Sequence, residues 1–392
     1  MKTISKILIF VSMSLALSGC DDFLTKEPET NLSPNTFFSS EAELELWTNR
    51  FYSLFAGPDT DAIQVSDIQI AKNLSSVQQG TRSPATENWG TSAWAYLRYI
   101  NYYLERSGNC PDETIRQRYD GVAYFFRALF YFEKVRKYGD IPYYDFVIPS
   151  NDWASLKRPR DSRGFVMKKV MEDLDRAITD LPDNWPSDAL YRLSKNAARA
   201  MKARAALYEG TFRKYHSREP SSDKPWQNDV NNADNKFLRE AAAAAKEIMD
   251  KGPFSLVTGD VKTAYRSLFT SAGLLTQEVI FGREYSKELS AFHETSWYYY
   301  SPTYGTKIAM TKKFMNTYLT TKGTPFTDID GYKTIDFIHE FDGRDARMAQ
   351  TVISPSYQMK ISGRTVPYSP NWKVTRTGYH PIKWSIDDDA DN

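Results

Sequence analysis

The sequence predicts a mainly helical protein in which helical hairpins stack into a scaffold and the second half is rich in loops. Between residues 40 and 252, apolar residues recur at three- and four-residue spacing in successive segments, bounded by capping residues, glycine and proline. Two of these segments are rich in alanine, which lets neighbouring helices approach closely, as in tetratricopeptide-type solenoids. Beyond residue 256, Tyr, Thr, Gly and Pro replace this pattern. We therefore expect a tetratricopeptide-like scaffold with a loop-rich face.

Three helices are predicted in the first third of the chain. Ser40 and Glu43 form a capping box at the start of the first one. The second covers residues 89–106 and ends before a glycine and a proline. The third, residues 112–137, is apolar nearly all round, which predicts burial on most sides. Because Arg127 lies in its apolar centre, where a guanidinium must find a carboxylate or carbonyl groups, we expect it to be structural.

Further helices follow with the same signals. Ser162 and Ser194 are predicted to cap the fourth and fifth helices, and residues 238–249 supply a partner for the fifth. In residues 57–86 the apolar residues do not recur at a regular spacing, which predicts loops with short elements. In the loop-rich second half, only residues 308–319 are predicted to be helical.

The first twenty residues predict export and lipid attachment. Lys2 and Lys6 precede an apolar stretch, residues 7–17, and small residues then lead to Cys20. The stretch is shorter than the roughly 20 apolar residues that span a bilayer, so we expect it to be part of a cleaved signal peptide. Acyl chains on Cys20 would then hold the protein on a membrane surface.

The predicted organisation has three parts. Residues 1–20 form the lipoprotein signal peptide, which ends at the lipidated cysteine. Residues 21–33 are polar and contain proline, which predicts a tether. Residues 34–392 form the folded domain, which is long enough to bury a substantial core without crosslinks. Since Cys110 would be the one cysteine left unmodified, no disulfide within the chain is expected.

Composition excludes some partners and favours others. The chain has 50 basic and 49 acidic side chains, and its net charge of +1 lacks the excess expected for binding nucleic acid. It contains 25 Tyr, 22 Phe and 9 Trp residues, whereas its mean hydropathy is −0.55. Many rings in a polar chain predict that some of them reach the surface.

No catalytic or metal-binding motif stands out, so we expect no enzyme and no cofactor. The histidines lie far apart in the sequence: His216, His293, His339 and His380. No nucleophile elbow, phosphate loop or dinucleotide fingerprint is present. Close carboxylates such as Asp328 and Asp330 fit glycoside hydrolysis in principle, but structural ion pairs are the favoured interpretation. The acidic run at residues 387–391 lacks the ligand spacing of a calcium loop and is expected to be solvated.

Several stretches, in chain order, resemble the SusD/RagB family of outer-membrane nutrient-binding lipoproteins. The stretches that carry the resemblance are residues 20–24, 126–128, 138–142, 158–160, 342–347 and 378–383. The resemblance is strongest over residues 20–281, and the Tyr-Gly-Asp-Ile-Pro sequence at 138–142 is its most distinctive part. Family members usually continue with a further helical stretch, whereas this chain stops at Asn392, so the resemblance implies that C-terminal helices are missing.

The resemblance implies a function at the cell surface. A protein of this family would be lipid-anchored in the outer membrane, capture a glycan or oligosaccharide, and deliver it to a SusC-like TonB-dependent transporter without making or breaking a bond. Two alternatives remain open. One is a surface glycosidase, and the other is a helical scaffold whose aromatic residues contact only protein partners.

The leading candidate for a sugar-binding site is a run of consecutive rings. A pyranose presents an apolar face that stacks on an exposed aromatic ring, with hydrogen-bonding side chains around it. Trp297, Tyr298, Tyr299 and Tyr300, with Tyr304 close behind, lie in a segment punctuated by Gly, Pro and Ser. Consecutive rings in an extended strand would alternate between two faces, so an inward-facing pair remains the alternative.

The segment between the first two predicted helices is the second candidate. It offers the polar side chains of Asn73, Gln78 and Arg82 beside the ring of Trp89. The resemblance implies that an Arg, a Trp and an amide side chain from this segment contact the ligand. The alternative is that Trp89 only packs against the start of its helix. Trp226 is a third ring expected at the surface.

Overall fold

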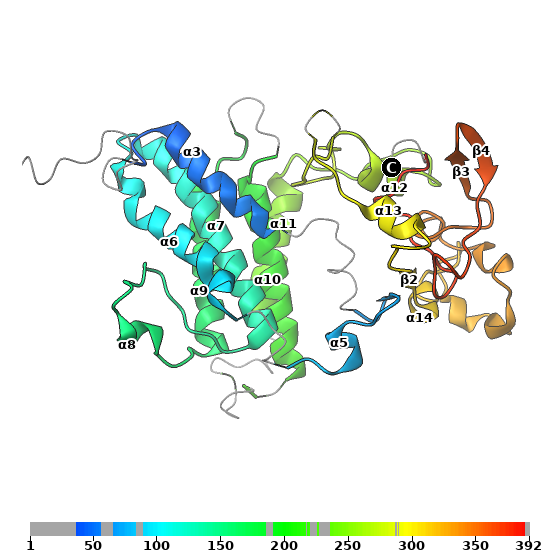
Figure 1. Ribbon diagram of the computed structural model, residues 1–392, viewed down its shortest axis with the longest axis horizontal. Coiled ribbons are helices and arrows are strands. Elements are labelled where there is room, and N and C mark those ends of the chain that lie inside the picture. The colour runs from blue at the N-terminus through cyan, green and yellow to red at the C-terminus, as the bar shows by residue number, and fades with distance from the viewer. Residues whose placement is uncertain are drawn as a thin grey trace, which may run out of the picture.

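The structure is a computed structural model, and helices packed side by side form one end of it while a loop-rich part forms the other (Figure 1). It describes residues 37–55, 66–83, 89–185, 191–216, 218–219, 226, 236–286, 288 and 290–388. The predicted mainly helical scaffold is confirmed. The predicted signal peptide with Cys20, and the tether, lie outside the described residues. Among the described helices, none has the length and apolar character needed to cross a membrane.

The helical part follows the predicted order. Its elements are α3 (Glu41–Asn49), η1 (Arg50–Leu54), η3 (Thr91–Trp94), α6 (Ala95–Arg106), η4 (Ser107–Asn109), α7 (Glu113–Tyr138), α8 (Trp153–Leu156), α9 (Arg163–Asp180), α10 (Lys195–Tyr215) and α11 (Lys236–Lys251). The capping box of Ser40 and Glu43 starts α3 as predicted. The Ser162 and Ser194 hydroxyls accept hydrogen bonds at the starts of α9 and α10. Helix α6 starts later than predicted, because residues 91–94 form a 3-10 turn.

Helix α7 is the centre of the hydrophobic core, which confirms its predicted burial. It packs along α9, which in turn contacts α10, and α10 packs along α11. Close approach at α10 depends on a glycine, because a Cβ on Gly210 would lie 2.7 Å from the Leu238 side chain. The predicted structural role of Arg127 is confirmed: this buried residue pairs with Asp173 on α9.

The loop-rich part contains short elements, as predicted. They are β1 (Gln69–Ile70), α5 (Ser76–Gln79), α12 (Ala264–Thr270), α13 (Thr295–Tyr300), β2 (Ala309–Met310), α14 (Lys312–Met315), η5 (Phe326–Asp328), η6 (Tyr332–Thr334), η7 (His339–Phe341), β3 (Gln358–Ile361) and β4 (Arg364–Pro367). Strands β3 and β4 form an antiparallel hairpin. Strand β1 pairs antiparallel with β2, with Gln69 opposite Met310. This pairing ties the segment after α3 to the second half of the chain.

The prediction of a helix over residues 308–319 is wrong. Residues 309 and 310 form β2, and only the one-turn helix α14 follows. The cause is tertiary pairing: the backbone N–H of Thr311 donates to the carbonyl of Ile68, and the Thr311 hydroxyl then caps α14. Long-range strand pairing therefore overrides the local helical period.

One smaller prediction is also corrected. Trp226 is only 5% exposed, because its indole N–H donates to the His216 carbonyl and its ring packs under the Arg213 guanidinium. His380 is fully buried. At the start of the acidic run, Asp387 is exposed and also pairs with the guanidinium of Arg266 at 2.6 Å.

Candidate functional site

The loop-rich part exposes a group of large aromatic rings. Trp297, Tyr304 and Trp372 have exposed fractions of 44%, 70% and 75%. The rings of Trp297 and Tyr304 stack with centroids 5.5 Å apart and planes 15° apart. The Lys307 ammonium lies 5.3 Å from the centroid of Trp372. We call these four residues the aromatic surface.

A tight turn at the end of α13 brings Tyr304 back over Trp297. The Ser301 carbonyl accepts a hydrogen bond from the Gly305 N–H at 3.0 Å, and the Tyr298 carbonyl accepts one from the Thr306 N–H at 3.2 Å. A Cβ at residue 305 would lie 2.2 Å from the Ser301 carbonyl oxygen, so the turn requires glycine. The local sequence therefore builds the stacked pair of rings.

Three segments that are far apart in the sequence meet at the aromatic surface. The backbone N–H of Lys72 donates to the Thr306 carbonyl at 2.6 Å, and the Arg376 guanidinium donates to the Lys72 carbonyl at 3.1 Å. Residues 66–73, 304–311 and 372–380 therefore lie side by side. Asn73, an exposed residue, follows directly after this junction and is the candidate from the second predicted group that lies near the stacked rings.

The four consecutive rings at 297–300 lie on a short helix, not on a strand or loop, and they do not share one face. Tyr299 is 1% exposed. Tyr300 stacks on His380 with ring centroids 5.2 Å apart, inside the protein. Tyr298 is half-buried, and its ring meets the Trp297 ring edge-on. Helical geometry thus divides the predicted platform, and Trp297 is its exposed ring.

Burial has an electrostatic consequence beneath the surface. His380 is enclosed by the rings of Tyr299 and Tyr300, and this burial lowers its pKa to about 3. Burial also raises the pKa of the Tyr299 phenol. Both side chains are therefore uncharged at neutral pH and belong to the packed interior.

The remaining candidates hold the backbone in place. The Gln78 amide N–H groups donate to the carbonyls of Ser66 and Gln69 at 3.0 and 2.7 Å, which ties α5 to β1. The Arg82 guanidinium donates to the Lys137 carbonyl at 2.5 Å, at the end of α7. These contacts place Gln78 near the segment of Asn73, whereas Arg82 lies at the helical part of the protein.

Trp89, like Arg82, contacts the end of α7. Its ring meets the Trp94 and Tyr138 rings edge-on, and the Arg160 guanidinium lies 5.0 Å from its centroid. These neighbours agree with the packing role that the sequence left open as an alternative.

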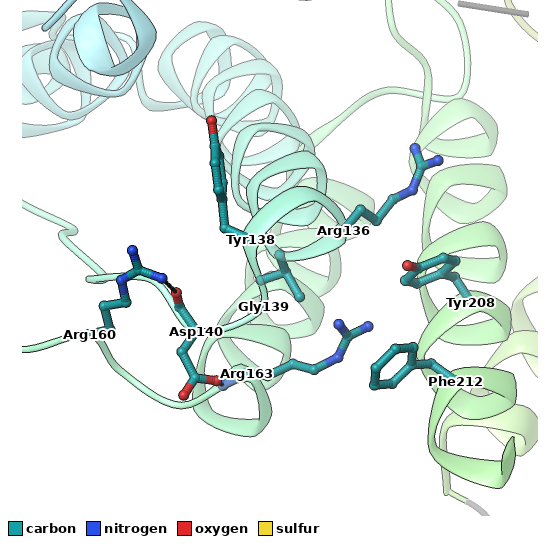
Figure 2. A pocket seen from close by; sticks show the side chains of 9 residues that line it. Arg136, Tyr138, Gly139, Asp140, Arg160, Arg163, Tyr208 and Phe212 are labelled. Atoms are coloured by element: carbon teal, nitrogen blue, oxygen red, sulfur yellow. Dashed lines mark hydrogen bonds between the residues drawn. The ribbon is translucent and has the colours of Figure 1, made fainter. Parts of the chain in front are cut away.

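Figure 2 shows a pocket between the end of α7 and α10. Its volume is about 510 Å³, and Tyr138 and Arg160, which contact the Trp89 ring, are among its lining residues. The residues lining it are Val135, Arg136, Tyr138, Gly139, Asp140, Arg160, Arg163, Tyr208 and Phe212. Two of its guanidinium groups already have carboxylate partners: Arg163 pairs with Glu209 and Arg136 pairs with Glu133, each at 2.8 Å. Because carboxylates of the protein already neutralise these two guanidinium groups, the pocket is not our leading candidate for the ligand-binding site.

Trp372 and Lys307 were not predicted as site residues from the sequence. The available signal was a lone tryptophan after Pro370 and Asn371, in a polar stretch. Nothing in the sequence indicates that this ring lies near residues 304–307. Within the described residues, no three side chains of His, Cys, Asp or Glu gather closely enough to hold a metal ion.

The helical-hairpin scaffold thus carries an open surface of rings, on which the apolar face of a ligand can stack. Comparison with known families agrees. Residues 22–207 match a family described as "Starch-binding associating with outer membrane", and residues 277–392 match the SusD family. The chain belongs to the SusD/RagB family, which confirms the resemblance seen in the sequence.

Two relatives come from Formosa agariphila. SusD-like protein P2 is 28% identical over 226 residues, which cover 53% of this chain and 44% of that protein. SusD-like protein P25 is 22% identical over 310 residues, which cover 73% of this chain and 53% of that protein. The chain thus spans about half the length of the curated relatives it matches.

Solved structures share the fold. A SusD-like protein from Bacteroides fragilis matches with a TM-score of 0.70 and 22% identity, covering 92% of this chain and 72% of that one. A SusD-like carbohydrate-binding protein from the same species gives a TM-score of 0.67 and 20% identity, covering 89% and 68%. A structure with a xylogluco-oligosaccharide gives 0.53 and 14%, covering 86% and 60%. The likeness confirms the tetratricopeptide-like scaffold.

Proposed function

We propose that this protein binds an oligosaccharide at the aromatic surface and delivers it to a SusC-like TonB-dependent transporter in the outer membrane. The observation that carries the proposal is the exposed, stacked pair of Trp297 and Tyr304. A third exposed ring, Trp372, lies against Lys307, which follows Tyr304 closely in the chain. Family membership supports a carbohydrate as the ligand.

The chemistry of the surface suits a sugar. Stacking on an aromatic ring buries the C–H face of a pyranose, while its hydroxyl groups need donors and acceptors at the ring edges. The exposed side chains of Asn73 and Arg376 supply such groups at the junction of the three segments. An open surface covers less of its ligand than an enclosed pocket does, so we expect modest affinity.

Anchoring would place this surface outside the cell. In the proposal, Cys20 carries the acyl chains and residues 21–33 tether the domain, so that the scaffold sits next to the transporter. Several acyl chains suffice for stable attachment, because each buried CH₂ contributes about 0.8 kcal/mol. Replacing Cys20 with serine should release the protein from the membrane fraction, and its retention there would refute lipid anchoring.

Titration of the mature chain against a panel of oligosaccharides tests the binding step. Trp297→Ala should lower the affinity for the bound sugar about tenfold, as expected for the loss of one stacked ring. Trp153→Ala is the matched control, because Trp153 lies on α8 in the helical part and is 65% exposed. Equal affinities of the two variants would remove the aromatic surface from the proposal. Release of new reducing ends by the wild type would favour the glycosidase alternative instead.

A further inference from the structure

The segments that build the aromatic surface are rich in positive charge. They carry the cations Lys72, Lys307, Lys373 and Arg376. The one acidic residue on these segments is Asp67, and Glu294 stands at the N-cap of α13. The net charge of the whole chain is only +1, so this local excess does not reflect a basic protein.

One of the two acidic groups is already compensated. The Asp67 carboxylate lies 3.1 Å from the Lys313 ammonium of α14, and this hydrogen bond holds the pKa of Asp67 below its usual value. Asp67 therefore stays ionised and paired with a lysine from outside the three segments. It does not neutralise the cations at the rings.

The cations lack such partners. Within the described part of the chain, none of Lys72, Lys307, Lys373 and Arg376 has a carboxylate oxygen within 4.0 Å. By contrast, Arg266 pairs with the Asp387 carboxylate at 2.6 Å. Uncompensated cations on a surface attract anions and strengthen hydrogen bonds to them.

Lys307 places a positive charge next to the rings on which a sugar would stack. Its ammonium lies 5.3 Å from the centroid of the Trp372 ring, and its backbone follows directly after the turn that positions Tyr304. A sugar stacked on either ring would therefore have a cation within reach of its substituents. Arg376, fixed by its hydrogen bond to the Lys72 carbonyl, adds a second cation on the neighbouring segment.

We infer that the aromatic surface prefers a glycan that carries anionic groups, carboxylate or sulfate, over a neutral one. This inference rests on the proposed function, since it concerns the same surface. The rings supply affinity for the sugar face, and the lysine and arginine side chains select for charge around it.

Two matched pairs of glycans test the inference in calorimetric titrations of the mature chain. Polygalacturonate is compared with its methyl ester, and dextran sulfate is compared with dextran. In 50 mM NaCl the charged member of at least one pair should bind about tenfold more tightly, and the preference should shrink in 500 mM NaCl because salt screens surface charges. The pair that shows the preference identifies the anion as carboxylate or sulfate.

Two variants distinguish the effect of a charge at the aromatic surface from the effect of the protein's overall charge. Lys307→Met keeps the length of the side chain but removes its charge, and it should weaken binding of the preferred charged glycan about threefold to fivefold. Lys322→Met is the control, because Lys322 is exposed in the turn between Leu319 and Pro325, outside the three segments. Equal losses in both variants would overturn the inference.

The outcomes distinguish the inference from the proposed function. If both members of each pair bind equally well and Trp297→Ala weakens both, the proposed function stands and the charge preference is refuted. If Trp297→Ala leaves every affinity unchanged, the proposed function itself fails. Absence of binding to all four glycans overturns the inference, because the panel presents both kinds of anion.

Discussion

Arg127 on α7 and Asp173 on α9 form a buried, bidentate ion pair. The Nε and Nη2 atoms of the guanidinium each donate to one carboxylate oxygen at 2.7 Å. The Asn101 side-chain oxygen of α6 accepts a further, longer hydrogen bond from Nη1 at 3.4 Å. The pair thus connects helices α7 and α9 at the centre of the core, where neither charge is exposed to water.

Breaking this pair should be costly. Arg127→Met leaves the Asp173 carboxylate buried without its cation, so we expect a loss of about 3–5 kcal/mol in the free energy of unfolding. Arg127→Met combined with Asp173→Leu should lose much less, because no charge is then stranded. Guanidinium denaturation followed by circular dichroism measures both. A double variant no more stable than the single one would contradict this account of the pair.

Asp120 on α7 should make stability depend on pH. Burial raises the pKa of its carboxyl to about 6, although hydrogen bonds from Ser107 and Tyr103 oppose the shift. The folded state therefore favours the protonated acid, and stability should fall as pH rises from about 4 to about 6. Above pH 6 the loss should level off at about 3 kcal/mol.

The variant Asp120→Asn isolates this effect. An amide has no charge to bury, so the variant should be more stable than the wild type at pH 7 and of similar stability near pH 3.5. Urea denaturation at pH 3.5, 5 and 7 gives the difference in unfolding free energy. A difference that is constant with pH would show that the carboxyl does not titrate in this range.

Gly305→Ala should disturb the stacked rings. The new methyl group would lie 2.2 Å from the Ser301 carbonyl oxygen, so the turn must open and Tyr304 must move away from Trp297. We expect a stability loss of about 1–3 kcal/mol, together with weaker binding of the sugar. At Gly273 an added Cβ meets no atom within 4 Å, so Gly273→Ala should change stability by less than about 0.5 kcal/mol. Unchanged sugar affinity in Gly305→Ala would show that the turn does not position the ligand.

The ring of Tyr304 should matter more than its hydroxyl. Tyr304→Phe keeps the face that stacks on Trp297, so its affinity for the sugar should stay within about twofold of the wild type. Tyr304→Leu removes the aromatic face and should lower the affinity about fivefold to tenfold. Calorimetric titration with the best-binding oligosaccharide compares the two. A larger loss in the phenylalanine variant would assign the binding to the hydroxyl instead.

The helical part was predictable because its signals are local. The cap at Ser162 and the apolar helix around Arg127 depend on residues within a few turns of each other. The element at 308–319 was not predictable in this way, because the Thr311 N–H donates its hydrogen bond to the carbonyl of Ile68, far away in the sequence. Trp226 was assigned to the surface by its polar neighbours, but its contacts with His216 and Arg213 bury it.

The helical scaffold, the family and Trp297 as a candidate ring follow from the amino-acid sequence alone, since periodicity, caps and motifs depend on neighbouring residues. Which rings meet depends on the tertiary structure. It turned Tyr299 inward, stacked Tyr304 on Trp297, and brought Trp372 to Lys307 from more than sixty residues away. The reason is physical: a binding surface assembled from three segments depends on long-range backbone hydrogen bonds and packing, which leave no periodic trace in the sequence.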